Sequence, residues 1–416
     1  MHKVKKIRMN NTLLIIANVT NIHTHRFIRE FRLRGWSVRV LSPQPPNRIN
    51  RREFGDAIIR LPANAIYRCL VKLPQLRYSE FHNINSGVKW YEPYSITTLF
   101  NYAYLILSIR RIVKRINPRG IFSIYLTMNG FLAALSGHER IVCSAAGADV
   151  SIHEKRSISY WINHPAILRI AMKKAGMVLG FDRDTFEPLF KKKGCGTDNI
   201  KWMPHWGVET NRFTPRSDFK NPNCTFICSR PYRMQFDFES ILLALKRIYQ
   251  EGNDIQFIIA SGAQSEKNLK PLVQSLHKTG CVGMGFIRIL GHIDYEKLPA
   301  LQRQCDVYID PINIRKSPET KGWGVSGSLL EAMSCGLIPV ISRRPGFDWI
   351  LPNEAISFVY NDFENGLYHA LKKAMQSRND LALRMSMRNA VIQKANWKKN
   401  LGTINDFLTG KPAGDR

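Results

Sequence analysis

The fold is decided by residues 324–340, which read GVSGSLLEAMSCGLIPV. A loop of small residues leads into a helical pattern at 328–335, Gly336 ends that helix, and the apolar run 338–342 follows directly. A helix that passes through one glycine into an apolar strand is typical of α/β folds. The unpaired N–H groups at the start of such a helix can bind a phosphate. The stretch therefore predicts an α/β domain with an anion-binding loop.

The same alternation of short apolar strand and helix runs along the whole chain. In the first half we expect helices at 26–34 and 102–116 and strands at 13–19, 38–41, 57–61, 121–126, 141–144, 177–180 and 200–203. In the second half we expect a helix at 238–249 and strands at 225–228, 255–260, 286–290, 307–310 and 338–342. Apolar runs that are bounded by turn residues and separated by helices indicate parallel sheets covered on both faces. We therefore expect an α/β protein of two doubly wound halves with a cleft between them.

Prolines and glycines mark the boundary between the two halves, beginning with Pro204 and Gly207. We expect a Rossmann-like domain over residues 1–205, a linker over 206–222 and a second Rossmann-like domain over 223–390. Residues 391–416 are expected to form a C-terminal helix that packs back toward the first domain.

The charge of the chain is its unusual property. The 416 residues include 61 Lys and Arg against 32 Asp and Glu, a net charge of +29, and +20 of this excess lies in residues 1–200. Such an excess favours an anionic partner, which can be nucleic acid, a membrane surface or a phosphorylated substrate. No recognised module interleaves basic and aromatic residues, so we expect no nucleic acid partner. No apolar run reaches the length of about 18 residues that a membrane-spanning helix needs.

Metal and redox sites are not expected. The eight cysteines show no C-x-x-C or Cys/His spacing and are interpreted as buried free thiols in a reducing cytosol. Asp182-Arg183-Asp184 resembles a metal-binding D-x-D pattern, but Asp184 stands three residues before Glu187 at a helix start, and capping explains this better. We expect neither a metal nor a resident cofactor.

Four further segments carry a family resemblance. They are Asn117-Pro118 before the strand at 121–126, AGAD at 146–149, PHWGVETNRFTP at 204–215 and FDWI at 347–350. Together with residues 324–340, and in this order, they resemble the motifs of the family 4 (group 1) retaining glycosyltransferases over roughly residues 12–400. The resemblance implies the GT-B fold, which has two Rossmann-like domains facing across a cleft. It also implies metal-independent transfer of a sugar from a nucleotide-sugar, a UDP- or GDP-sugar, with retention at the anomeric carbon.

The resemblance places the donor in the second domain. In the family, two acidic residues eight positions apart contact the donor, the first near the sugar and the second on the ribose. Glu331 matches the second of them, whereas Trp323 stands at the position of the first. The backbone of the loop can still bind sugar hydroxyls, and an indole can stack on a sugar ring. The implied donor-binding residues are Gly207, Gly291, Trp323, Gly324, Ser326, Gly327, Ser328 and Glu331. From spacing alone, Ser328 and Glu331 are better explained as a helix capping box, which needs no ligand.

The catalytic residues implied by the resemblance are Arg230, Arg233 and Asp149. A basic pair normally neutralises the donor diphosphate; Arg230 matches its first member, and Arg233 substitutes for the usual lysine. The alternative is that both arginines belong to a solvated loop. Asp149 would orient or deprotonate the acceptor hydroxyl, or else caps a turn. On the acceptor side we place His23 and Asn21, with a helix start as the alternative for His23.

The resemblance implies a lipid-linked saccharide acceptor, in the assembly of a bacterial envelope polysaccharide such as lipopolysaccharide. The basic first domain is expected to bind an anionic membrane, so that the enzyme works in the cytoplasm, peripherally on the inner face of the cytoplasmic membrane. The residues expected to form this surface are Arg26, Arg29, Arg32, Arg34, Arg48, Arg51, Arg52, Arg110, Arg111, Lys114 and Arg115. Two alternatives stay open: a sugar-nucleotide epimerase on the same fold, and a catalytically degenerate partner subunit of a glycosyltransferase complex.

Overall fold

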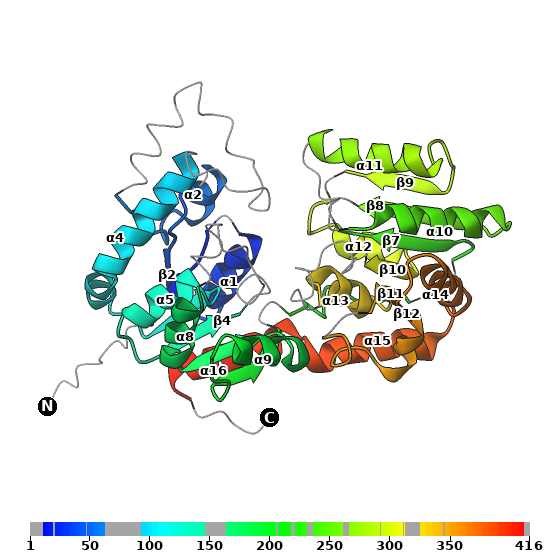
Figure 1. Ribbon diagram of the computed structural model, residues 1–416. Helices are drawn as coiled ribbons and strands as arrows, with labels where there is room; N and C mark the ends of the chain where they lie inside the picture. Colours follow the sequence, from blue (N-terminus) through cyan, green and yellow to red (C-terminus); the bar gives the residue numbers. More distant parts are fainter. Residues whose placement is uncertain are drawn as a thin grey trace, which may run out of the picture. The chain divides into compact units, whose positions relative to one another are not determined.

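The structure is a computed structural model in which the chain divides into two compact units (Figure 1). Unit 1 comprises Met1–Gly180, Phe186–Trp202 and Gly402–Arg416, and unit 2 comprises Phe181–Thr185 and Met203–Leu401. The residues that the structure describes are 11–19, 21–46, 48–62, 93–145, 164–204, 207–217, 221–230, 236–260, 266–291, 293–310, 312, 325–343 and 346–411.

Unit 1 is built on a six-stranded sheet in the order β2-β1-β3-β4-β5-β6, in which every pair of neighbours is parallel. Its strands are β1 (Thr12–Ile16), β2 (Ser37–Leu41), β3 (Gly120–Ile124), β4 (Ile141–Ser144), β5 (Met177–Gly180) and β6 (Ile200–Trp202). Its helices are α1 (Ile22–Leu33), α2 (Arg48–Phe54), α4 (Pro93–Ile116), α5 (Met128–Leu135), α8 (Pro165–Lys174) and most of α9 (Arg183–Lys192). All residues of β3 and β4 are buried, because helices cover both faces of the sheet.

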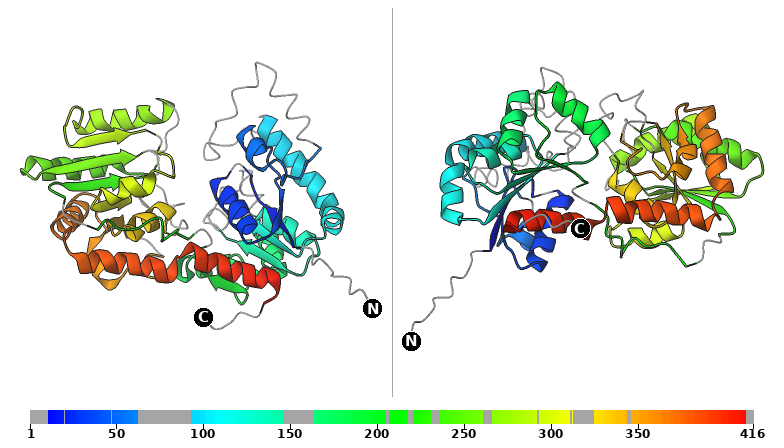
Figure 2. Two further views of the ribbon diagram at one scale, coloured as in Figure 1. Left: turned by 180° about the vertical axis from the view of Figure 1, so that it is seen from behind. Right: turned by 90° about the horizontal axis from the view of Figure 1, so that it is seen from below.

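Unit 2 has a second parallel six-stranded sheet, in the order β12-β11-β10-β7-β8-β9. Figure 1 labels its strands, and Figure 2 shows the ribbon from two further sides. Its strands are β7 (Cys224–Cys228), β8 (Ile255–Ala260), β9 (Ile287–Leu290), β10 (Val307–Asp310), β11 (Ile338–Ser342) and β12 (Val359–Tyr360). Its helices are α10 (Phe238–Gln250), α11 (Glu266–Thr279), α12 (Leu298–Arg303), α13 (Gly327–Ser334), the 3-10 helix η3 (Asn353–Phe358), α14 (Asn365–Gln376) and α15 (Leu381–Lys394). The helix α16 (Trp397–Thr409) follows.

Most predicted strands are confirmed within a few residues, and the differences have local causes. The strand predicted at 57–61 is wrong: only Ile58 forms an isolated bridge, to Val40. The helix predicted at 26–34 begins earlier, at Ile22, because Asn21 caps it. Within residues 391–416 the structure has α16, and α15 precedes it from Leu381 to Lys394. None of the helices in the described ranges is long and apolar enough to cross a membrane.

A buried charge network holds α13 in place in unit 2. The Asp306 side chain is fully buried and the Arg384 side chain is 1% exposed, and their Oδ1 and Nη1 atoms lie 3.1 Å apart. Asp306 Oδ1 also accepts a hydrogen bond from Arg216, and Asp306 Oδ2 accepts one from the backbone N–H of Thr225 at the start of β7. Arg384 Nε donates to the carbonyl of Gly336 at 2.8 Å. The network therefore ties α15 to β7, to the residue before β10 and to the end of α13.

Candidate functional site

The candidate site in unit 2 lies where two neighbouring strands end. β7 and β10 are parallel and adjacent, so Arg230, two residues after β7, and Asp310, the last residue of β10, stand at the same edge of the sheet. Ligands of such sheets bind outside the carboxyl ends of the strands. Tyr308 lies in the same strand two residues before Asp310, and the charges of Asp310 and Arg230 act on its pKa in opposite directions.

Helix α13 contributes its N-terminus to this site. Ser326 is the N-cap, and its Oγ accepts a hydrogen bond from the backbone N–H of Leu329 at 3.2 Å. The capping box expected at Ser328 and Glu331 is therefore wrong, because the cap lies two residues earlier. Glu331 stands beyond the first turn and is half-buried. Spacing could not separate the two serines, since either one precedes a helical pattern.

Tyr308 connects β10 to α13, and the sequence did not single it out. Its hydroxyl donates a hydrogen bond to Ser328 Oγ at 2.9 Å, and Ser328 Oγ lies 3.3 Å from Ser326 Oγ. Burial, followed by the negative charge of Asp310, raises the pKa of Tyr308, so that its phenol keeps its proton. A protonated phenol that donates to Ser328 leaves the Ser328 hydroxyl able to donate onward to a bound anion.

Arg230 is positioned by stacking. Its guanidinium carbon lies 4.9 Å from the centroid of the Phe236 ring, a cation–π distance. Within the described residues, Arg230 Nε and Ser229 Oγ are buried without a hydrogen-bond partner. Buried donors are normally satisfied, so two such donors at a strand end indicate a place for a ligand with oxygen acceptors. Phe236 and Asp310, like Tyr308, are members of the site that sequence reasoning missed.

Two predicted donor-binding glycines lie elsewhere in unit 2. Gly291 follows β9, the edge strand, and a Cβ added there would meet nothing within 4 Å. Gly207 has a φ of +32°, and an added Cβ would lie 2.8 Å from the Ala395 carbonyl oxygen and 2.9 Å from the backbone nitrogen of Trp397. The structure thus places Gly207 in a close contact between backbones. Four predicted residues, Asp149, Arg233, Trp323 and Gly324, lie outside the described residues.

The two predicted acceptor-side residues lie at the start of α1 in unit 1. Asn21 is the N-cap: its Oδ1 accepts a hydrogen bond from the backbone N–H of His23 at 2.9 Å, and its Nδ2 donates to the Tyr125 hydroxyl at 3.0 Å. Tyr125 follows β3 and has a φ of +73°, which is uncommon for a residue other than glycine. Burial, and then the charge of Arg26, lowers the pKa of His23 to about 4, so this imidazole is neutral at pH 7.

The D-x-D segment lies at a helix start, as expected. Asp182 Oδ1 accepts a hydrogen bond from the backbone N–H of Thr185 at 2.7 Å, and Asp184 lies in the first turn of α9. A capping role for this segment is therefore confirmed, but the capping residue is Asp182 and not Asp184 as expected. Across the described ranges, no three His, Cys, Asp or Glu side chains gather as metal ligands would.

The two six-stranded parallel sheets, each in its own unit with helices, give an α/β protein of the GT-B fold. Residues 222–377 match the family model described as glycosyl transferases group 1. This part of the chain, from just before β7 through α14, is therefore a group 1 glycosyl transferase domain. No curated protein sequence matches the chain.

Solved structures share the fold over nearly the full length. A sucrose-phosphate synthase from Thermosynechococcus elongatus aligns with a TM-score of 0.69 at 12% identity, covering 96% of this chain and 99% of its own. A glycosyltransferase from Rickettsia africae aligns with a TM-score of 0.64 at 14% identity, covering 97% and 100%. HepE from Anabaena, solved in complex with UDP-glucose, aligns with a TM-score of 0.63 at 12% identity, covering 96% and 99%.

The fold is also shared by a putative UDP-N-acetylglucosamine 2-epimerase from Listeria monocytogenes. It aligns with a TM-score of 0.52 at 11% identity, covering 97% of this chain and 98% of its own. At such identities the likeness concerns the fold alone, so the distinction between transfer and epimerisation rests on the site.

Proposed function

We propose that this protein transfers a sugar from a nucleotide-sugar, a UDP- or GDP-sugar, to a lipid-linked saccharide with retention of anomeric configuration. The observation that carries the proposal is the convergence of Arg230, Ser326 and Ser328 at the ends of β7 and β10 and at the start of α13. This site lies within the group 1 glycosyl transferase domain. HepE, which shares the fold, was solved in complex with UDP-glucose, and this supports a UDP-sugar as the donor.

In the proposed reaction the diphosphate is the leaving group. The bond between the anomeric carbon and the phosphate oxygen breaks, and the acceptor oxygen bonds to the anomeric carbon. The acceptor proton passes to the departing phosphate. Arg230 and the N-terminus of α13 stabilise the negative charge that develops on the diphosphate. In this proposal Asp149 acts on the acceptor and Glu331 on the ribose, so neither carboxylate is available as a nucleophile. We therefore propose that the acceptor attacks the face that the diphosphate leaves, without a covalent intermediate.

We place the acceptor in unit 1 and the work of the enzyme on the inner face of the cytoplasmic membrane, in envelope polysaccharide assembly. The supporting observation is the charge of +20 in residues 1–200, most of which form unit 1. An anionic leaflet attracts such a surface and brings the protein to a lipid-linked substrate.

The test is a nucleotide panel with the full chain. We expect UDP or GDP to raise the melting temperature, and one nucleotide-sugar to be consumed only when a lipid-linked saccharide fraction is present. Consumption of the donor without acceptor would favour the epimerase. Nucleotide binding without either turnover would favour a degenerate partner subunit. If no nucleotide stabilises the protein, the donor site is wrongly assigned.

The hydrogen bond from Tyr308 gives a finer prediction. Tyr308→Phe removes the donor that orients the Ser328 hydroxyl. We expect the KM for the donor to rise about 3- to 10-fold, the effect of one hydrogen bond, while kcat changes little. Steady-state kinetics at varied donor concentration measures this. Tyr249→Phe, on the exposed side of α10, is the control and keeps the wild-type KM. An unchanged donor KM in Tyr308→Phe would show that the orientation of the Ser328 hydroxyl does not contribute to phosphate binding.

A further inference from the structure

The outward face of α4 in unit 1 is apolar over its middle turns. Leu107 is 89% exposed and Phe100 is 63% exposed, and Tyr104 and Ile106 are also exposed. Phe100, Tyr104 and Leu107 follow one another at spacings of four and three residues, so they share one face of the helix. A contiguous exposed patch of large apolar side chains marks an interaction surface rather than an ordinary solvated face.

The opposite face of α4 is already occupied. Leu105, Ile109, Ile112 and Val113 are buried. Polar contacts fix the same helix: Asn101 Nδ2 donates to the Pro43 carbonyl at 2.7 Å. The helix therefore packs against its unit through this face, which leaves the outward face as the exposed one.

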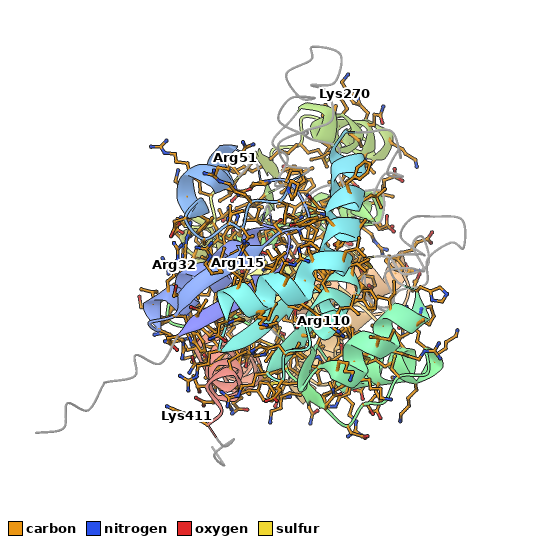
Figure 3. All side chains as sticks on the ribbon, turned by 90° about the vertical axis from the view of Figure 1, so that its left-hand side faces the viewer. Arg32, Arg51, Arg110, Arg115, Lys270 and Lys411 are labelled. Carbon is orange, nitrogen blue, oxygen red and sulfur yellow. The ribbon has the colours of Figure 1, made fainter. Side chains whose placement is uncertain are left out.

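The outward face becomes basic along its last turns. Arg110, Arg111, Lys114 and Arg115 are all exposed, and α4 contains no Asp or Glu. Arg111 and Lys114 continue the line of Leu107 at spacings of four and seven residues, which keeps them on the same face. None of the four forms an ion pair with an acidic residue of the described ranges. Figure 3 shows α4 at the front of the view, with Arg110 and Arg115 on it.

Two arginines of α1, Arg29 and Arg32, differ from those of α4, because acidic neighbours partly neutralise them. Arg29 pairs with Glu53, and Arg32 Nη2 lies 2.7 Å from Asp56 Oδ2. On α4, by contrast, four basic side chains without an acidic partner in the described ranges stand beside exposed apolar side chains.

We propose that α4 is the membrane-docking element of this protein, and that its partner is an anionic lipid bilayer. Phe100, Tyr104 and Leu107 enter the boundary between headgroups and acyl chains, while Arg110, Arg111, Lys114 and Arg115 contact lipid phosphates. This pairing of an apolar stripe with basic residues on one helix is what interfacial helices present to anionic membranes. Between Phe100 and Lys114 the helix rises about 21 Å, so both groups reach one flat surface at once. The inference deepens the proposed membrane partner, and it rests on that part of the proposed function alone.

The first experiment measures sedimentation of the full chain with vesicles of phosphatidylcholine containing phosphatidylglycerol. We expect Leu107→Glu to weaken binding by about tenfold or more, because it places a charge where an apolar side chain inserts. Leu243→Glu, on the exposed face of α10 in unit 2, is the matched control and binds as the wild type. The double variant Arg111→Glu/Lys114→Glu is expected to lose binding to a similar degree, whereas Lys270→Glu/Lys373→Glu keeps it.

Different outcomes identify other partners. Equal losses in the α4 variants and their unit 2 controls would mean a general charge effect and would overturn the proposal. Wild-type binding in Leu107→Glu would overturn it as well. Binding to phosphatidylcholine alone that equals binding to the anionic vesicles would remove the role of the basic residues. Vesicle binding requires no turnover, so a failed donor assay with intact vesicle binding rejects the glycosyltransferase function and leaves this inference standing.

Insertion itself has a direct readout. The seven cysteines of the described ranges are all buried, so Leu107→Cys in a Cys69→Ser background offers one exposed thiol for a polarity-sensitive fluorophore. We expect its emission to shift to the blue on anionic vesicles. A probe at Leu243→Cys in the same background should not shift. Emission that stays unshifted at position 107 while the protein binds would mean that α4 does not enter the lipid.

Discussion

Replacing Arg230 with glutamate is expected to lower kcat for sugar transfer by about 10²- to 10³-fold, the usual cost of removing a donor aimed at developing negative charge. The side chain follows β7 at the edge of the sheet where Tyr308 and Ser328 meet, and it stacks on Phe236. A carboxylate in that place would repel the departing diphosphate. It would also leave Asp310 beside a second negative charge.

The conservative variant separates charge from geometry. Arg230→Lys keeps the positive charge but loses the planar fork that can grip two phosphate oxygens, so we expect an intermediate loss. Lys373→Glu, an exposed reversal of the same charge at the end of α14, is the control and keeps the wild-type kcat. Turnover in Arg230→Glu within a few-fold of the wild type would place the diphosphate elsewhere and remove Arg230 from the mechanism.

The parts of this site that the sequence predicted are those that local pattern defines. β10 was predicted with its observed bounds, and α13 within one residue, because apolar runs and a terminal glycine mark their ends. Arg230 was proposed because it matches the family's basic position after the strand at 225–228. These signals involve residues close together in the chain, so one sequence is enough to show them.

The parts that the sequence missed depend on partners distant in the chain. Tyr308 lies within a buried strand and has the pattern of a core aromatic residue; only its contact with Ser328, twenty residues later, gives it another role. Asp306 and Arg384 are 78 residues apart, and neither carries a local signal of the other. Spacing could not resolve the N-cap of α13 either, since Ser326 and Ser328 are both good capping residues and the difference of two residues moves Glu331 out of the first turn.

The buried pair gives the largest expected effect on stability. Asp306→Ala removes the carboxylate that pairs with Arg384, whose side chain is only 1% exposed. It also removes the acceptor for the backbone N–H of Thr225. An uncompensated buried charge costs about 3–5 kcal/mol of unfolding free energy. For a unit of this size we expect the melting temperature to fall by roughly 10 °C. Thermal unfolding followed by calorimetry measures the change in unit 2.

Two comparisons show whether burial is the cause. Asp294→Ala removes an exposed ion pair in which Asp294 Oδ2 lies 3.4 Å from Lys297 Nζ, and it should change the unfolding free energy by no more than about 0.5 kcal/mol. Replacing both partners, as Asp306→Leu with Arg384→Met, should recover part of the loss, because neither charge of this pair is then left buried without the other. A loss in Asp306→Ala no larger than that in Asp294→Ala would show that Arg384 finds other acceptors, such as the Gly336 carbonyl that it already contacts. In that case α13 would be held by the carbonyl contacts of Arg384, and the candidate donor site would not depend on Asp306.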